Sequence, residues 1–168
     1  MPVRPTRRIA AALALAFATA PVAAHAAGPD LAGAWTLVRA DNIAPDGTRT
    51  ALYGPAPEGS LMFDGQGRYA IQIARPGRPA FAAGDKAKGT AEEYRAASLG
   101  YNAHFGRYEI VGKVLTFRIE RASFPNWEGQ VQARDFSLQG DRLTYRVPAP
   151  TSGAGAVGEV EWWRVRPD

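Results

Sequence analysis

Short segments in which apolar and polar residues alternate dominate this sequence. In residues 68–74, for example, the side chains of Tyr69, Ile71 and Ile73 fall on one face. Turn sequences separate these segments, as Asp-Gly-Gln-Gly does at residues 64–67. A period of two is typical of β-strands with one buried face, and short turns join antiparallel neighbours. The pattern therefore predicts an all-β fold.

About eight such segments follow one another between residues 34 and 165. Sequential hairpins of this number can close into an antiparallel up-and-down barrel, which leaves no exposed sheet edge. We expect Trp35 to plug one end of the barrel. Seven alternating residues are expected to point inward: Tyr69, Ile71, Ile73, Phe117, Ile119, Leu143 and Tyr145. A barrel of eight strands is either filled by its side chains or holds one small ligand, and the alternation leaves both open.

One helix is predicted after the third strand. Thr90 and Glu93 form a capping box, in which each side chain accepts a hydrogen bond from the other residue's backbone amide. The helix is expected to run from Ala91 to about Asn102. The preceding segment, residues 75–89, is rich in Pro and Gly and reads as a loop. We expect this loop and the helix to act as a lid over one end of the barrel.

The N-terminus has the three parts of a secretory signal. Three arginines lie among the first eight residues, an apolar run covers residues 9–22, and Ala24-His25-Ala26 supplies a cleavage pattern. The run is shorter than the ~20 residues of a membrane-spanning helix. The sequence predicts a signal peptide at residues 1–26 and one mature domain at residues 27–168. That domain is expected to be exported, either periplasmic or secreted, without stable membrane insertion.

Charge and residue usage narrow the chemistry of the mature domain. The net charge of +4 includes the three arginines of the predicted signal, so the domain is nearly neutral and nucleic-acid binding is not expected. The chain has no cysteine, which excludes thiol catalysis and thiolate metal sites. His104 is the one histidine after residue 26. We therefore predict no metal and no cofactor, and a monomer or weak dimer.

Several short motifs occur in order along nearly the whole mature chain, and through them the chain resembles the lipocalin-like domain family, a group distinct from the classical lipocalins. The motifs are Gly33-Ala34-Trp35, residues 53–61, Gly67-Arg68-Tyr69, residues 75–81, residues 89–94, residues 106–109, residues 123–127 and residues 140–143. The resemblance implies a lipocalin-type barrel with an internal apolar cavity. It implies little about activity, because a fold does not specify a reaction.

Polar residues on two consecutive predicted strands are candidates for orienting a ligand. Arg118 and Glu120 share a face of one strand, and Gln132 and Arg134, with Gln130, share a face of the next. Directed inward, they would bind a carbonyl or carboxylate group; directed outward, they form a solvated surface with cross-strand ion pairs. Phe117, Ile119 and Val131 alternate with these residues, which favours the outward alternative for both faces.

The remaining candidates come from the helix, the segment that follows it and a loop. His104 is placed at the helix end, either as a structural hydrogen-bonded residue or in a pocket. Asn126 and Trp127 lie in a strand-connecting loop that suits a pocket rim. The full candidate set for ligand binding is Tyr69, Tyr101, His104, Arg118, Glu120, Asn126, Trp127, Gln132 and Arg134.

Three functions remain open at this point. The leading hypothesis is an exported protein that binds a small, mainly apolar molecule in the barrel interior. The first alternative is a cyclase- or isomerase-type enzyme in which Glu120, Tyr69 or His104 transfers a proton. The second is a filled barrel that serves as an interaction module. A raised carboxyl pKa inside the barrel favours the enzyme, an open cavity without one favours binding, and a packed interior favours the module.

Overall fold

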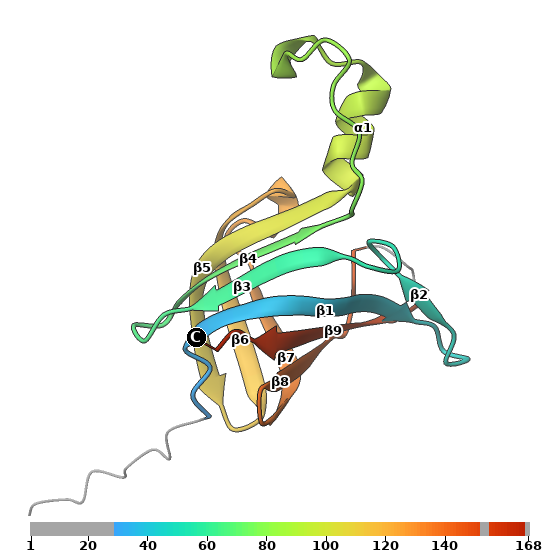
Figure 1. Ribbon diagram of the computed structural model, residues 1–168. Coiled ribbons are helices and arrows are strands. Elements are labelled where there is room, and N and C mark those ends of the chain that lie inside the picture. The colour runs from blue at the N-terminus through green and yellow to red at the C-terminus, as the bar shows by residue number, and fades with distance from the viewer. Residues whose placement is uncertain (1–28, 152–154, 167–168) are drawn as a thin grey trace, which may run out of the picture.

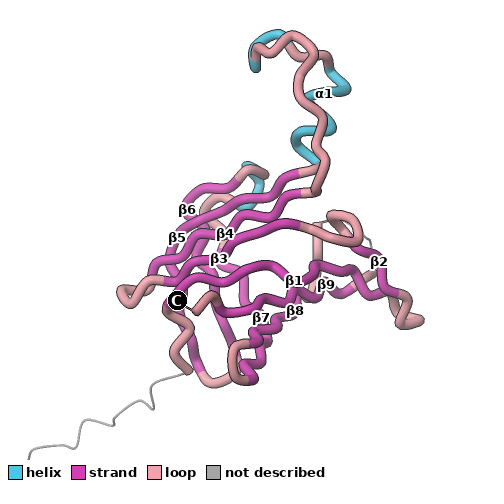
Figure 2. Tube along the Cα trace, viewed as in Figure 1, coloured by secondary structure: helices cyan, strands magenta, loops and turns pink. Residues whose placement is uncertain are grey.

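The computed structural model describes residues 29–151 and 155–166. The predicted signal peptide lies outside these ranges. Nine strands form one antiparallel sheet, and they make up most of the described chain (Figure 2). The elements are β1 (Gly33–Ile43), β2 (Arg49–Ala51), β3 (Glu58–Phe63), β4 (Arg68–Ala74), the 3-10 turn η1 (Lys86–Lys88), α1 (Ala91–Leu99), β5 (Tyr101–Val111), β6 (Val114–Ala122), the 3-10 turn η2 (Pro125–Trp127), β7 (Val131–Gln139), β8 (Arg142–Val147) and β9 (Val157–Arg164).

The sheet closes on itself because the first strand pairs with the last. The order is β2-β1-β3-β4-β5-β6-β7-β8-β9, and β1 also pairs with β9 from Trp35–Arg164 to Ile43–Val157. The predicted antiparallel barrel of eight strands is thereby confirmed. β2 is a short extra strand that pairs only with the end of β1. The helix α1 lies between β4 and β5, the third and fourth strands of the closed barrel (Figure 1).

The seven residues predicted to point inward are all buried in one core, together with two tryptophans. Trp35 and Trp162 have no exposed surface. The indole Nε1 of Trp35 donates to the carbonyl of Leu31 at 3.0 Å, and the Arg164 guanidinium lies 4.2 Å from the centre of its ring. These contacts seal the end of the barrel where β1 begins.

The segment between β4 and β5 stands away from the barrel as an arm (Figure 1). Its predicted capping box is present, since Glu93 N–H donates to Thr90 Oγ1 and Thr90 N–H donates to Glu93 Oε2. The helix ends at Leu99, three residues earlier than predicted, because Gly100 caps it and Tyr101 pairs with Ala74 in the sheet. α1 has no buried residue. Within the described ranges, no helix is long and apolar enough to cross a membrane.

β5 and β6 come unusually close at a bulge. The register shifts between Phe105, opposite Arg121, and Gly106, opposite Ile119, which leaves Glu120 as the extra residue. A Cβ atom added to Gly106 would lie 2.1 Å from the carbonyl oxygen of Arg118. Only glycine permits this approach of the two backbones.

Candidate functional site

A cavity of about 620 Å³ opens inside the barrel at the end opposite Trp35. Ile71, Ile73, Phe117 and Val160 form much of its apolar wall. The other lining residues are Ala40, Asp41, Leu52, Tyr53, Asn102, His104, Phe124, Asn126, Trp127, Gln130, Val131, Gln132, Ala133, Arg134, Tyr145, Val147, Pro148, Ala149, Pro150, Thr151 and Gly158. The interior is thus packed at one end and hollow at the other.

His104 contributes a neutral imidazole to the cavity wall. It sits in β5 opposite Ile71, and its Nδ1 lies 2.8 Å from the hydroxyl of Tyr69 in a hydrogen bond. Burial, reinforced by the positive charge of Arg134, lowers the pKa of His104 to about 3. Burial raises the pKa of Tyr69. Whichever partner carries the shared proton, the pair is uncharged at neutral pH.

Two polar side chains of β7 face the same interior. Strand register places Gln132 opposite Phe117 and Arg134 opposite Leu115, and both partners are core residues. Paired residues project from the same face of a sheet, so Gln132 and Arg134 point inward. The Arg134 guanidinium donates to Gln132 Oε1 and, at 3.0 Å, to the carbonyl of Ala133. Burial lowers the pKa of Arg134, whose group nonetheless remains charged at neutral pH.

Aromatic side chains from η2 and the residue before it form the rim. Trp127 makes edge-to-face contacts with Phe124 and His104, with ring centres 5.6 and 5.8 Å apart. Asn126 also lines the opening, and its carbonyl accepts a hydrogen bond from Gln130 Nε2 at 2.7 Å. The loop predicted to border a pocket therefore does so.

Three of the predicted site residues lie on the outer face of the barrel. Arg118 pairs with Arg107 and is more than half exposed, with Glu109 3.8 Å away. Glu120 forms surface ion pairs with Arg68 and Arg107, because Ile119 between it and Arg118 points inward. A pocket role for Arg118 and Glu120 is therefore wrong. The two polar faces predicted to act together lie on opposite sides of the barrel wall.

Tyr101 is likewise outside the cavity. Its hydroxyl donates to Gln72 Oε1 at 2.9 Å on the outer face, and Arg78 lies over its ring. The reason is the early end of the helix, which makes Tyr101 the first residue of β5 rather than a helical one. The same correction applies to His104, which lies within a strand and not at a helix end.

Sequence reasoning missed Asn102 and Tyr53. Asn102 precedes His104 by two residues in β5, so both project into the cavity, and the buried Oδ1 of Asn102 has no hydrogen-bond partner among the described residues. Alternation would have found it had residues 101–104 been assigned to a strand. Burial raises the pKa of Tyr53, and a hydrogen bond from Asn102 partly opposes this. Tyr53 lies between strands, where no periodicity marks it.

The arm also does not touch the cavity. No residue of the predicted lid, residues 75–89 and α1, lines it. The lid prediction is wrong for this conformation, in which the arm extends away from the barrel (Figure 1).

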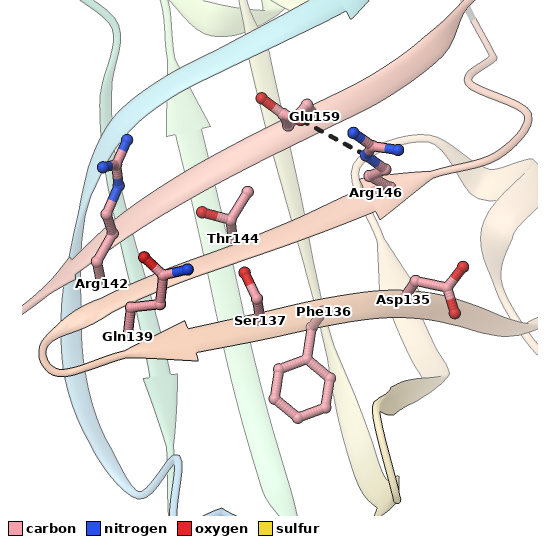
Figure 3. A pocket seen from close by; sticks show the side chains of 8 residues that line it. All are labelled: Asp135, Phe136, Ser137, Gln139, Arg142, Thr144, Arg146 and Glu159. Atoms are coloured by element: carbon pink, nitrogen blue, oxygen red, sulfur yellow. Dashed lines mark ion pairs between the residues drawn. The ribbon is translucent and has the colours of Figure 1, made fainter.

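A second hollow, of about 440 Å³, lies on the outer surface of β7, β8 and β9 (Figure 3). Its polar side chains include Arg142, Thr144 and Glu159, whereas the Phe136 ring is turned away from them toward the core. Glu159 is already neutralised by Arg39 and Arg49 at 2.9 and 3.0 Å. The groove is therefore an ion-paired surface and a poor site for an apolar molecule. Among the described residues, no three His, Cys, Asp or Glu side chains gather as a metal site.

A family model described as a lipocalin-like domain matches residues 32–165, which include every strand of the barrel and the whole cavity wall. The chain belongs to the lipocalin-like domain family. The resemblance seen in its motifs is thereby confirmed.

Individual relatives are distant. The chain is 32% identical over 87 residues to a 4'-hydroxy-3'-methoxypropiophenone carrier protein of Aspergillus oryzae, an alignment that spans 47% of this chain and 78% of that relative. A lipocalin-like protein from Bacteroides uniformis superposes with a TM-score of 0.44 and 14% identity, covering 82% of this chain and 100% of that one. An uncharacterized protein from Bacteroides eggerthii superposes with a TM-score of 0.43 and 13% identity, covering 81% of this chain and 100% of that one.

Proposed function

We propose that this lipocalin-like protein is an exported carrier that holds a small, mainly apolar molecule in the barrel cavity. The observation that supports this best is the cavity itself, whose volume falls within the ~300–1,000 Å³ typical of small-molecule sites. Its walls are largely apolar, with a few polar groups at defined positions. The relative named as a carrier of an aromatic ketone is consistent with such a role. A filled barrel acting only as an interaction module would lack this space.

The polar groups of the cavity suit binding better than proton transfer. Glu120, the carboxylate considered for catalysis, lies outside the barrel. His104 stays neutral down to about pH 3, and burial moves the pKa of Tyr69 upward, away from neutrality. Efficient acid–base catalysts have pKa values near the working pH. Tyr69 and His104 are therefore assigned to hydrogen bonding.

Binding is tested with the neutral fluorophore N-phenyl-1-naphthylamine, which brightens in apolar surroundings. We expect saturable binding by the wild-type protein. Val147→Trp, at the cavity mouth, is expected to weaken it about tenfold because the indole occupies ligand space. Val111→Trp is the matched control, since Val111 is 67% exposed at the outer end of β5. Absence of wild-type binding, or equal binding by both variants, would contradict the proposal.

Export is tested separately. We propose that residues 1–26 are removed, and the intact mass of the protein recovered from its own organism should then correspond to a chain that begins at residue 27, within about two residues. An intact N-terminus on a cytoplasmic protein would overturn this part of the proposal without affecting the carrier function.

A further inference from the structure

The cavity holds one charge that no described protein group neutralises. Of the described residues that line it, only Arg134 and Asp41 carry a formal charge. The Asp41 carboxylate is used on the outer face, where its Oδ2 lies 3.2 Å from both Arg39 and Arg49. Arg134 forms no ion pair with any described residue, and its two hydrogen bonds go to the neutral oxygens of Gln132 and Ala133. The interior is therefore net positive.

An unpaired cation in an apolar cavity is unfavourable unless something compensates it. A guanidinium has five donors arranged to grip a carboxylate or similar oxyanion with two parallel hydrogen bonds. Arg134 uses two of its donors in the contacts described, so others remain for a ligand. Gln132 fixes the direction of the guanidinium, which prepares it for an anion in one place.

The rest of the wall indicates what the anion is attached to. Trp127 and Phe124 present aromatic rings at the rim, and His104 lies edge-to-face with Trp127. Deeper in the wall, the ring of Phe117 also contacts His104, with 5.9 Å between the ring centres. Rings favour edge-to-face and offset contacts with other rings. A planar apolar body between these side chains would leave an acidic group free to reach Gln132 and Arg134 of β7, which line the same cavity.

We infer that the ligand is an amphipathic monoanion, with an aromatic or other apolar body and one carboxylate or equivalent oxyanion bound by Arg134. This inference rests on the proposed carrier function and adds the ligand's charge. Neutral apolar molecules enter the same cavity, but they leave the guanidinium unpaired and bind less selectively.

The test compares two fluorophores that share one skeleton, 8-anilinonaphthalene-1-sulfonate, which is an anion, and neutral N-phenyl-1-naphthylamine. Arg134→Met should weaken binding of the anion about tenfold or more, because it removes a charge-assisted hydrogen bond, and change binding of the neutral probe less than about twofold. Arg134→Lys keeps the charge but loses the two parallel donors of the guanidinium. Its affinity for the anion should therefore lie between those of the wild type and of Arg134→Met. Arg118→Met is the control, since Arg118 lies on the neighbouring strand but faces outward.

A second measurement uses the wild-type protein alone, in case Arg134→Met fails to fold. 2-Naphthoate should displace bound N-phenyl-1-naphthylamine at a concentration about tenfold lower than 2-naphthalenemethanol does. Equal displacement, or equal loss of both fluorophores in Arg134→Met, would overturn the anion inference while the carrier function stands. If neither fluorophore binds the wild-type protein, the carrier function itself is wrong and the inference falls with it.

Discussion

His104 is a histidine kept neutral by its surroundings, and this makes stability depend on pH. In the unfolded chain it takes up a proton below pH 6.5, but in the folded protein only near pH 3. Between these values the unfolded state binds more protons, so lowering the pH favours unfolding. This destabilisation of the folded state by His104 is absent above pH 6.5. As the pH falls below 6.5, it grows by at most about 1.4 kcal/mol per pH unit.

We therefore predict that His104→Asn flattens this dependence. The side-chain amide of the variant retains a polar atom for Tyr69 but does not titrate. Urea unfolding from about pH 7.5 to about pH 4 should show the free energy of unfolding falling more steeply for the wild type than for the variant. Parallel curves for the two proteins would mean that His104 is not held neutral in the folded state.

The absence of a side chain at Gly106 lets the backbones of β5 and β6 approach each other closely. Gly106→Ala should destabilise the fold by about 1–3 kcal/mol or more, since its Cβ would overlap the Arg118 carbonyl and push β5 and β6 apart. Gly65→Ala is the matched control, because a Cβ there meets nothing within 4 Å. Chemical unfolding measures both, and equal midpoints would contradict the close approach.

At the residue scale, the sequence predicted which residue types form the barrel better than it predicted which side chains point inward. Alternation placed Phe117 and Ile119 inside, and by the same rule their neighbour Arg118 outside. For β7 the same rule was wrong, since it favoured Val131 inside, whereas Gln132 and Arg134 point inward and Val131 is exposed. Strand register decides this, and register arises from pairing between strands that the sequence does not display.

At the scale of the element, the arm between β4 and β5 is held together by its own contacts. Arg75 N–H donates to the Gly100 carbonyl at 2.9 Å, so the two ends of the arm already lie side by side. The arm also has hydrogen bonds of its own, such as the one that the Tyr94 hydroxyl donates to the Lys86 carbonyl at 2.8 Å. The capping box made this helix predictable, whereas its position relative to the barrel depended on contacts that no local motif encodes.

We predict that the barrel folds without the arm. Replacing residues 76–99 by Asn-Gly should join β4 to β5 as a tight hairpin. The melting temperature should stay within about 4 °C of the wild type or rise, because a shorter loop costs less entropy to close. Binding of N-phenyl-1-naphthylamine should persist. Failure to fold, or loss of binding in a folded variant, would show that the arm supports the barrel or its cavity.

At the scale of the whole molecule, the closing pair of strands carries an ionic network on its outer face. Arg39 of β1 contacts Glu159 and Glu161 of β9 at 2.9 and 2.8 Å, and the two carboxylate side chains are only 8% and 6% exposed. Arg142 also holds Glu161, at 2.7 Å, and these arginines lower the pKa of Glu161. The network links β8, β9 and β1 where the barrel closes.

We predict that Arg39→Met weakens closure. Two nearly buried carboxylates lose a partner each, which should lower the free energy of unfolding by about 1–3 kcal/mol. Arg121→Met is the control, since Arg121 is 70% exposed and lies 4.0 Å from Glu128, a pair expected to contribute less than about 1 kcal/mol. Urea unfolding distinguishes the two, and similar midpoints would argue against a structural role for the network.

The overall architecture was predictable because hairpin rhythm and strand count leave few alternatives to a barrel. The residue that pairs with Trp35 where β1 and β9 close the barrel was not predictable, since Arg164 is distant in sequence and no local signal links the two residues. The family resemblance implied an apolar cavity, but the full set of residues that line it was beyond the sequence, because a hollow depends on how side chains from many strands meet.

The pairing of β1 with β9 has a consequence for how the chain is made. Until Val157–Arg164 has left the ribosome, β1 has no partner on one side and the sheet keeps two open edges. Folding must then wait for contacts between residues far apart in sequence, which form slowly. The last strand of the barrel is thus the one that commits the chain to the closed sheet, and before it is made the earlier strands cannot complete the barrel.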